Sequence, residues 1–136
     1  MFKRKHESHE IKLRPTEAIA KCLRNYKNFH GRASRSEFRW FSFVTFLCAW
    51  PLLLTTYSDE LLIQVLSFFY LILTLAVVVP QAAVWCRRMH DVGKSGKLWT
   101  FIFLPVIGWL MLWRWTHKPG DPEDNDYGPV PVPEGF

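Results

Sequence analysis

The residues most able to do chemistry stand together in the segment Arg87–Gly96, which lies between two long apolar runs. Its ten residues include four charged side chains, one histidine and two glycines. Three kinds of chemistry suit these residue types: proton transfer by His90 with Asp91, metal binding through a histidine, and anion binding by lysine beside a helix N-terminus. Each of these needs further residues at a defined spacing, so the surrounding sequence decides among them.

The sequence Gly93-Lys94-Ser95 is similar to the end of a nucleotide-binding P-loop, but the match fails. A P-loop needs a glycine five positions before Gly93, and this chain has Arg88 there, with no strand pattern before it. A more local anion site remains, because Ser95 is placed to cap the helix that follows while Lys94 and Lys97 flank its free amides. At a membrane surface the available anion is a lipid phosphate.

His90 and Asp91 are the candidates for catalysis or metal binding. Cys86 and His90 have the i, i+4 spacing of two ligands on one helix face, but two ligands make a weak metal site. A general-base role for His90 needs a nucleophile or a substrate pocket, and the sequence identifies neither. We therefore predict no metal, no cofactor and no catalytic residue, and expect Asp91 to pair with an arginine beside His90. The candidate partners of Asp91 are Arg32, Arg35 and Arg88.

A second polar motif, Ser34-Arg35-Ser36-Glu37, precedes the first apolar run. It is typical of a capping box, in which Ser34 accepts from the Glu37 amide and Glu37 reaches back to the Ser34 amide. Arg32 and Arg35 are expected at the level of the lipid headgroups. The predicted binding residues, of which all but the last two are expected to form one network, are Arg32, Arg35, Glu37, Arg87, Arg88, His90, Asp91, Lys94 and Ser95.

Three apolar runs must position these motifs, and they predict a membrane protein. Residues 40–57 and 61–85 carry no charge, while the third run, 98–113, holds Pro105 and Gly108 near its middle. At about 1.5 Å per residue, the first two runs are long enough to cross the hydrocarbon core of a bilayer. The predicted fold class is an all-α membrane protein. Its membrane domain covers residues 16–131, with three transmembrane helices over about 39–57, 61–85 and 98–115.

Shorter segments flank these spans. Residues 16–29 predict an amphipathic interfacial helix, with Thr16 as its N-cap, Glu17 in its first turn and Gly31 placed to end it. Residues 1–15 predict a basic mobile arm, and residues 132–136 an extended tail.

The distribution of basic residues orients the chain. Residues 1–39 hold eleven of the seventeen lysines and arginines, residues 86–97 hold four more, and the turn at 58–60 holds none. By the positive-inside tendency, the N-terminus and the 86–97 loop are cytoplasmic. A single third span then places the acidic C-terminal segment on the opposite side. A re-entrant turn at residues 105–108 is the alternative, and it would return that segment to the cytoplasm.

Three motifs, in this order, resemble the domain-of-unknown-function family 805. They are Phe29–Phe38, Arg87–Gly96, and Pro119-Gly120 followed by Asn125–Pro129. The resemblance covers about residues 26–131 and implies a small multi-pass protein of the bacterial inner membrane with no agreed activity. Three spans would put its C-terminus in the periplasm. The departures from the family pattern are Arg39 and Lys97, where an aromatic residue is common, and Asp126, where a basic residue is common.

The leading functional interpretation is non-catalytic: the cytoplasmic Arg/His/Asp surface binds anionic lipid headgroups or a partner membrane protein. The first alternative is a subunit of an oligomeric transporter or channel, with Gln64, Gln81 and His90 along its path. The second is a membrane enzyme that uses His90 and Asp91. The net charge of +5 comes without a stacking motif or recognition helix, so nucleic acid is not an expected partner. The expected partners are membrane lipids, a second copy of the chain or another membrane protein.

Overall fold

The computed structural model describes residues 12–55 and 57–131, and within them every regular element is a helix. The order is α1 (Pro15–Arg24), α2 (Arg35–Thr55), α3 (Leu61–Asp91), the 3-10 helix η1 (Gly96–Phe103) and α4 (Ile107–His117). Across the described residues the β-structure is limited to one isolated bridge, between Asn125 and Gly128. The predicted all-α class is confirmed. The predicted tail at 132–136 and most of the predicted arm lie outside the described residues.

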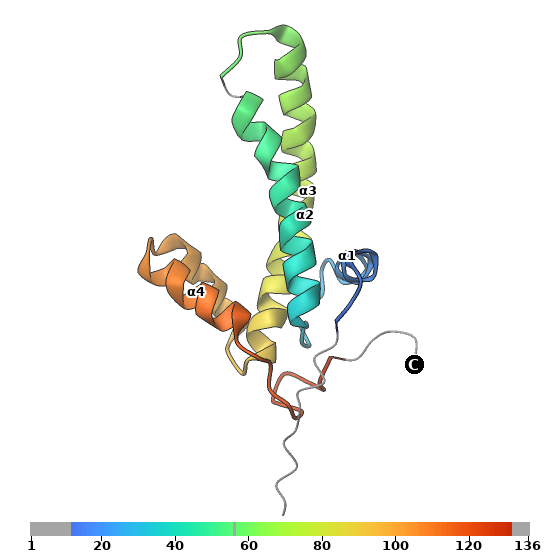
Figure 1. The fold of residues 1–136 in the computed structure, drawn as a ribbon, viewed down its shortest axis with the longest axis vertical. Coiled ribbons are helices and arrows are strands. Elements are labelled where there is room, and N and C mark those ends of the chain that lie inside the picture. The colour runs from blue at the N-terminus through green and yellow to red at the C-terminus, as the bar shows by residue number, and fades with distance from the viewer. Residues whose placement is uncertain (1–11, 56, 132–136) are drawn as a thin grey trace, which may run out of the picture.

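Helices α2 and α3 form a long antiparallel hairpin that makes up most of the height of the molecule (Figure 1). Polar contacts along the hairpin join the two helices. The Gln81 side chain donates to Ser42 Oγ (2.9 Å) and accepts from Thr45 Oγ1 (3.0 Å), and Thr74 Oγ1 donates to the Cys48 carbonyl (3.4 Å). Polar side chains between apolar helices usually face one another rather than lipid, and these do.

Helix α3 is the one helix in the described part of the chain that is long and apolar enough to cross a membrane. Its burial changes along its length: large apolar side chains from Leu61 to Val79 are exposed, while Pro80–Asp91 is mostly buried by other parts of the protein. The exposed stretch of nineteen residues measures about 28 Å at 1.5 Å per residue, close to the thickness of the hydrocarbon core. The remaining turns of α3 therefore belong to a separate, packed region. We call this region, which consists of Pro80–Asp91 and the segments packed against it, the base.

The third apolar run doubles back instead of continuing as one helix. η1 ends at Phe103, Val106 adopts φ 62°, and α4 begins at Ile107. The indole of Trp109 donates to the Ile102 carbonyl (2.8 Å), and the rings of Phe101 and Trp115 pack edge to face with centroids 5.7 Å apart. A β-carbon on Gly108 would lie 2.0 Å from the Phe101 carbonyl oxygen, so only glycine permits this approach. The single helix predicted over 98–115 does not form, and the chain reverses where the re-entrant alternative expected it.

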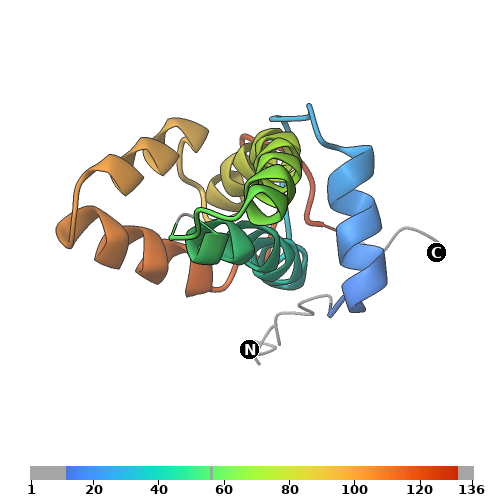
Figure 2. The same cartoon turned by 90° about the horizontal axis from the view of Figure 1, so that it is seen from above.

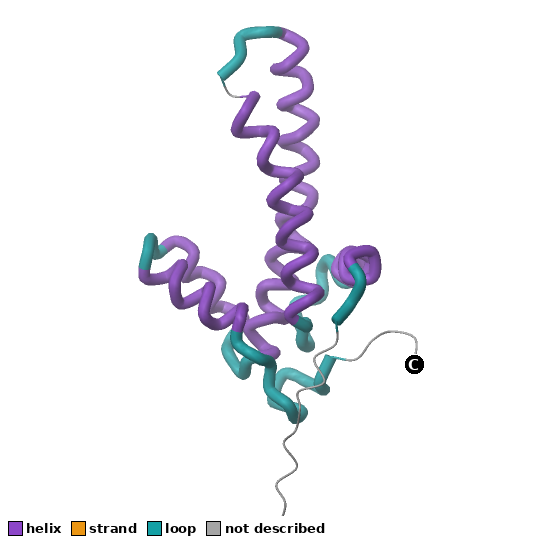
Figure 3. Tube along the Cα trace, in the orientation of Figure 1, coloured by secondary structure: helices purple, strands orange, loops and turns teal. Residues whose placement is uncertain are grey.

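This reversal returns the C-terminal segment, residues 118–131, to the base, where the loops of the molecule gather (Figure 3). The Asp121 amide donates to the Asp91 carbonyl (2.7 Å), and Asn125 Nδ2 donates to the His90 carbonyl (2.9 Å). The C-terminal segment therefore packs against the end of α3 that leads into the 86–97 loop.

Helix α1 and the η1–α4 hairpin extend to opposite sides of the α2–α3 hairpin, as the view from above shows (Figure 2). α1 is shorter than the helix predicted over 16–29, because it ends at Arg24, where Asn25 Nδ2 caps the Lys21 carbonyl (2.9 Å). It begins one residue before Thr16, so the Thr16 cap is wrong. Glu17 acts as expected in the first turn and accepts from the Arg14 amide (3.1 Å).

Candidate functional site

Asp91, at the end of α3, is the centre of the first charge cluster in the base. Its Oδ1 accepts from Nε and Nη2 of Arg32, both at 2.9 Å, and its Oδ2 accepts from Nη1 of Arg88. The exposed fractions of the three side chains are 5%, 1% and 0%. Two cations on one buried carboxylate leave a net positive charge, so other acceptors must contribute.

Backbone carbonyls supply these acceptors. Arg88 donates to the carbonyls of Thr116 (3.1 Å), Ala33 (3.3 Å) and Lys118 (2.5 Å). Arg32 donates to those of Asp121 (2.5 Å) and Glu123 (2.7 Å). A guanidinium carries five N–H donors in a fixed plane, so one arginine can join several segments. Arg88 and Arg32 together connect α3 to the loop before α2, to the end of α4 and to the C-terminal segment.

Glu37 and Arg87 form a second buried cluster, which connects α1, α2 and α3. Arg87 Nη1 donates to Glu37 Oε1 (2.5 Å), and Lys21 Nζ of α1 lies 3.6 Å from Glu37 Oε2. The Cys22 thiol donates to Glu37 Oε1 over 3.6 Å. Burial is the main cause that raises the pKa of Cys22 to about 12, and the nearby Glu37 carboxylate is the second. The amide of Ala33 donates to the Arg87 carbonyl (3.0 Å), which places the two clusters side by side.

His90 has a packing role on the outer side of the first cluster. Its Nδ1 lies 3.0 Å from the Gly31 carbonyl, and its ring stacks on Tyr127 with centroids 4.1 Å apart and planes 3° apart. A β-carbon on Gly96 would lie 3.0 Å from His90 Nε2 and 3.1 Å from Cys86 Cβ, so a residue with a side chain at position 96 would crowd both. Among the described residues no group of three or more potential metal ligands occurs.

The geometry does not form the His90–Asp91 pair that an acid–base mechanism needs. The Asp91 carboxylate is occupied by two guanidinium groups, and the hydrogen bond described for the His90 ring joins its Nδ1 to the Gly31 carbonyl.

The structure brings together six of the nine predicted site residues as buried or half-buried groups in the base. Arg35 lies at the edge, where its Nη1 donates to the His117 carbonyl (3.3 Å). Lys94 and Ser95 are exposed; Lys94 lies 5.6 Å from the centre of the Trp115 ring, and Ser95 Oγ caps the Lys97 amide (3.4 Å), as predicted. The six that meet in the base are Arg32, Glu37, Arg87, Arg88, His90 and Asp91.

Two features differ from the sequence prediction. Ser34 Oγ accepts from the Glu37 amide (3.2 Å), but the Glu37 side chain turns to Arg87 rather than back to Ser34, so half of the capping box forms. The C-terminal segment was missed as part of the site. A β-carbon on Gly120 would lie 2.1 Å from Asp91 Oδ2, which explains the glycine. The signal that could have found this contact is the third motif itself, which contains Gly120.

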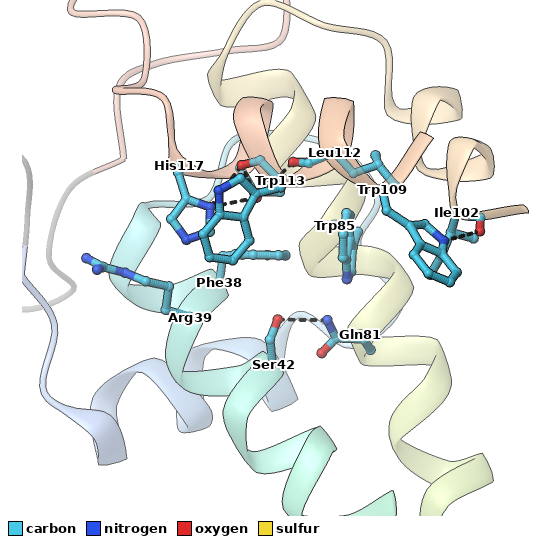
Figure 4. Close-up of a pocket in the computed structure, with 11 residues that line it drawn as sticks. Phe38, Arg39, Ser42, Gln81, Trp85, Ile102, Trp109, Leu112, Trp113 and His117 are labelled. Carbon is cyan, nitrogen blue, oxygen red and sulfur yellow. Dashed lines mark hydrogen bonds between the residues drawn. The ribbon is translucent and has the colours of Figure 1, made fainter. Parts of the chain in front are cut away.

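A groove of about 610 Å³ lies between α4 and the α2–α3 hairpin, next to the base. Figure 4 shows Arg39 at one end and Trp109 at the other, with Ser42 and Gln81 along one side. Aromatic contacts fix its walls: Phe38 and Trp85 pack edge to face with centroids 5.0 Å apart, and Trp113 stacks on His117 at 3.9 Å. Gln81, whose side chain joins α2 and α3, also borders the groove.

Comparison with known proteins places this architecture in a family. The profile described as "Protein of unknown function (DUF805)" matches residues 26–129, which include all three motifs of the base. The chain belongs to this family. Inner membrane protein YhaH of Escherichia coli K12 is 36% identical over 119 residues, which cover 82% of this chain and 93% of YhaH. Inner membrane protein YhaI of the same strain is 34% identical over 109 residues, which cover 80% of this chain and 90% of YhaI. No solved structure matches.

The DUF805 membership agrees with the structure in two respects. The relatives are named as inner membrane proteins, and this chain has a helix that can cross a membrane with an exposed apolar surface. These findings support the predicted inner-membrane location. The three DUF805 motifs, which are far apart in the sequence, meet in the base: Arg32 comes from the first, Arg88 and Asp91 from the second, and Gly120 from the third.

Proposed function

We propose that this DUF805 protein crosses the inner membrane twice, through α2 and α3, and binds anionic phospholipid headgroups on its cytoplasmic face. The observation that carries the proposal is a division among the basic residues of the base. Arg32, Arg87 and Arg88 are buried and paired, whereas a second set of cations is exposed around them. The exposed set includes Arg39, Lys94, Lys97 and Arg114, and we call it the basic rim.

The proposed orientation follows from where the charges lie. The far end of the α2–α3 hairpin carries Asp59 and Glu60, and residues 40–86 contain no lysine or arginine. The positive-inside tendency then places the base in the cytoplasm. Because residues 118–125 contact this base, both chain ends are cytoplasmic in the proposal, and η1–α4 enters the membrane surface without crossing. This replaces the predicted periplasmic C-terminus.

The buried clusters support the basic rim without binding lipid themselves. The side chains of Arg88, Arg32 and Arg87 are 0%, 1% and 3% exposed, so a headgroup phosphate cannot reach them without opening the base. Their contacts instead hold α1 and the η1–α4 hairpin in fixed positions beside the α2–α3 hairpin. Arginine suits this use because its planar guanidinium pairs with carboxylates and carbonyls at the same time.

The layout of opposite charge favours headgroups as the ligand of the basic rim. In the C-terminal segment, Glu123, Asp124 and Asp126 are exposed. This segment lies at the end of the molecule opposite the tip of the α2–α3 hairpin (Figure 1), which is away from the membrane in the proposed orientation. Large apolar side chains are exposed on both elements that flank the α2–α3 hairpin: Leu23 on α1, Tyr26 and Phe29 just after it, and Trp109 and Trp113 on α4. Aromatic residues are enriched at the interface, and each nearby lysine or arginine adds about 1 kcal/mol of attraction to an anionic leaflet.

The proposal is tested by exchanging phosphatidylglycerol and phosphatidylethanolamine around the purified protein in nanodiscs and measuring which lipid is retained in native mass spectrometry. The test variant changes Lys94, Lys97 and Arg114 to glutamine. The matched control changes Asp59→Asn and Glu60→Gln at the far end. We expect the wild type and the control to retain phosphatidylglycerol preferentially and the test variant to lose most of that preference. Equal retention of the two lipids by the wild type would overturn the proposal, and so would an unchanged preference in the test variant.

A further inference from the structure

The groove between α4 and the α2–α3 hairpin has the chemistry of a lipid-chain site. Its volume of about 610 Å³ lies in the range of roughly 300–1,000 Å³ that is typical of small-molecule sites. Its walls are aromatic and aliphatic, and Trp85, Trp109 and Trp113 contribute three indole rings. The Trp109 indole is fixed by its hydrogen bond to the Ile102 carbonyl, and Trp113 by its stack on His117. The groove is therefore formed before any ligand enters.

The mouth of the groove carries positive charge and no acid. Arg39 is exposed there, and the structure records no hydrogen bond or ion pair for its guanidinium within residues 12–55 and 57–131. Arg39 also borders a second hollow of about 560 Å³, on the side of α2 that faces the chain before α1, where Lys12, Trp40 and Phe43 are further lining residues. Neither hollow has an aspartate or glutamate among the described residues that line it.

The position of the groove identifies the class of ligand. Ser42 and Gln81 lie on its border, next to Pro80, where α3 passes from exposed apolar surface to the packed base. Above this level Phe43, Phe46 and Val79 are exposed and apolar. An apolar space at this level with a cation at its mouth matches a molecule with a hydrocarbon chain and an anionic head.

We propose that this groove binds one acyl chain of an anionic phospholipid, with the phosphate held by Arg39 at the mouth. The inference rests on the proposed headgroup binding and gives it one defined site. The basic rim then attracts anionic lipid generally, whereas Arg39 and the groove select a single molecule.

We test the site by photocrosslinking. Phosphatidylglycerol or phosphatidylethanolamine carries a photoactivatable diazirine on one acyl chain, and mass spectrometry of peptides maps the residues to which each lipid becomes attached. The full-length protein in nanodiscs is compared with Arg39→Gln and with the matched variant Arg114→Gln, whose arginine is exposed on α4 but does not line the groove. Trp109→Ala alters the wall, and Trp50→Ala is its control on the lipid-facing side of α2. Thermal melts confirm that each variant remains folded, which is expected because all four side chains are exposed.

We expect phosphatidylglycerol adducts in the wild type to concentrate on η1, α4 and the Trp85 peptide. Arg39→Gln should lower their yield about fivefold, the effect of one basic residue at a headgroup, and Arg114→Gln should leave the groove adducts in place. Trp109→Ala should redistribute the adducts, and Trp50→Ala should not. Equal groove adducts from both lipids would overturn the anionic-lipid assignment. Adducts spread evenly over α2 and α3 would overturn the site, while the retention experiment on the basic rim would still decide the proposed function separately.

Discussion

Replacing Asp91 with asparagine should loosen the base more than any other single isosteric change in it. The carboxylate compensates two buried guanidinium groups, Arg32 and Arg88, whose side chains are 1% and 0% exposed. Asparagine has nearly the same shape, but it removes the negative charge and presents an N–H donor to groups that are themselves donors. The substitution therefore tests electrostatics with little change in packing volume.

The expected magnitude follows from how the two arginines are otherwise bonded. Removing one partner of a buried ion pair costs about 3–5 kcal/mol, because the remaining charge is left without compensation. Arg88 keeps three backbone carbonyls and Arg32 keeps two, so hydrogen bonding persists while charge compensation is lost. We expect a loss of about 3 kcal/mol, at the low end of that range, and a fall in melting temperature of roughly 10 °C.

Tryptophan fluorescence during heating in detergent measures the melting temperature of the Asp91→Asn protein. Limited proteolysis of the folded protein reports separately on the C-terminal segment, which should be released because Arg32 and Arg88 hold it. The control is Asp126→Asn, which removes one charge from an exposed position of the same segment. If Asp91→Asn melts within about 1 °C of the wild type and resists protease equally, the charge cluster does not hold the base together, and the reasoning is refuted.

Three further outcomes are expected. Gly120→Ala should release the C-terminal segment to protease at a cost of about 1–3 kcal/mol, because its β-carbon would lie 2.1 Å from Asp91 Oδ2; protease resistance equal to the wild type would contradict this. In a variant whose only cysteine is Cys22, a maleimide should fail to react at pH 8 until the protein is denatured, since burial and Glu37 raise the thiol pKa to about 12; rapid labelling of the folded protein would be inconsistent with the packing of α1. Gln81→Leu should lower the melting temperature by the equivalent of about 1 kcal/mol, because it removes two hydrogen bonds between α2 and α3, and an unchanged melt would show that these bonds contribute nothing.

The sequence predicted the α2–α3 hairpin well because charge-free runs and the acidic turn between them are local signals. The η1–α4 hairpin was harder to predict. Residues 98–113 are as apolar as a span, and neither composition nor length says whether such a run crosses a membrane or doubles back. Pro105 removes one backbone donor, but the decisive contact is between Gly108 and the Phe101 carbonyl, and this contact exists only once the chain has folded back.

The sequence predicted which residues belong to the candidate site better than it predicted which of them pair with one another. An arginine partner for Asp91 was expected among three candidates, and Arg32 and Arg88 both take that role. The Glu37–Arg87 pair joins residues fifty positions apart, and local capping chemistry offered a competing role for Glu37. Residue types alone did not predict that these arginines are buried. Arginines at the end of a span suggest exposed headgroup ligands, and here they are the interior of the base.

In the proposed topology, both ends of the chain lie on the cytoplasmic side of the membrane together with the base. Reporter fusions in a bacterial inner membrane measure this directly, because green fluorescent protein folds in the cytoplasm and alkaline phosphatase becomes active in the periplasm. With the reporters fused after residue 136, we predict a fluorescent green fluorescent protein and an inactive phosphatase. With the reporters fused after Asp59, we predict an active phosphatase and no fluorescence. An active phosphatase at residue 136 would mean that η1–α4 crosses the membrane, and it would contradict the assembly of the three motifs on one side.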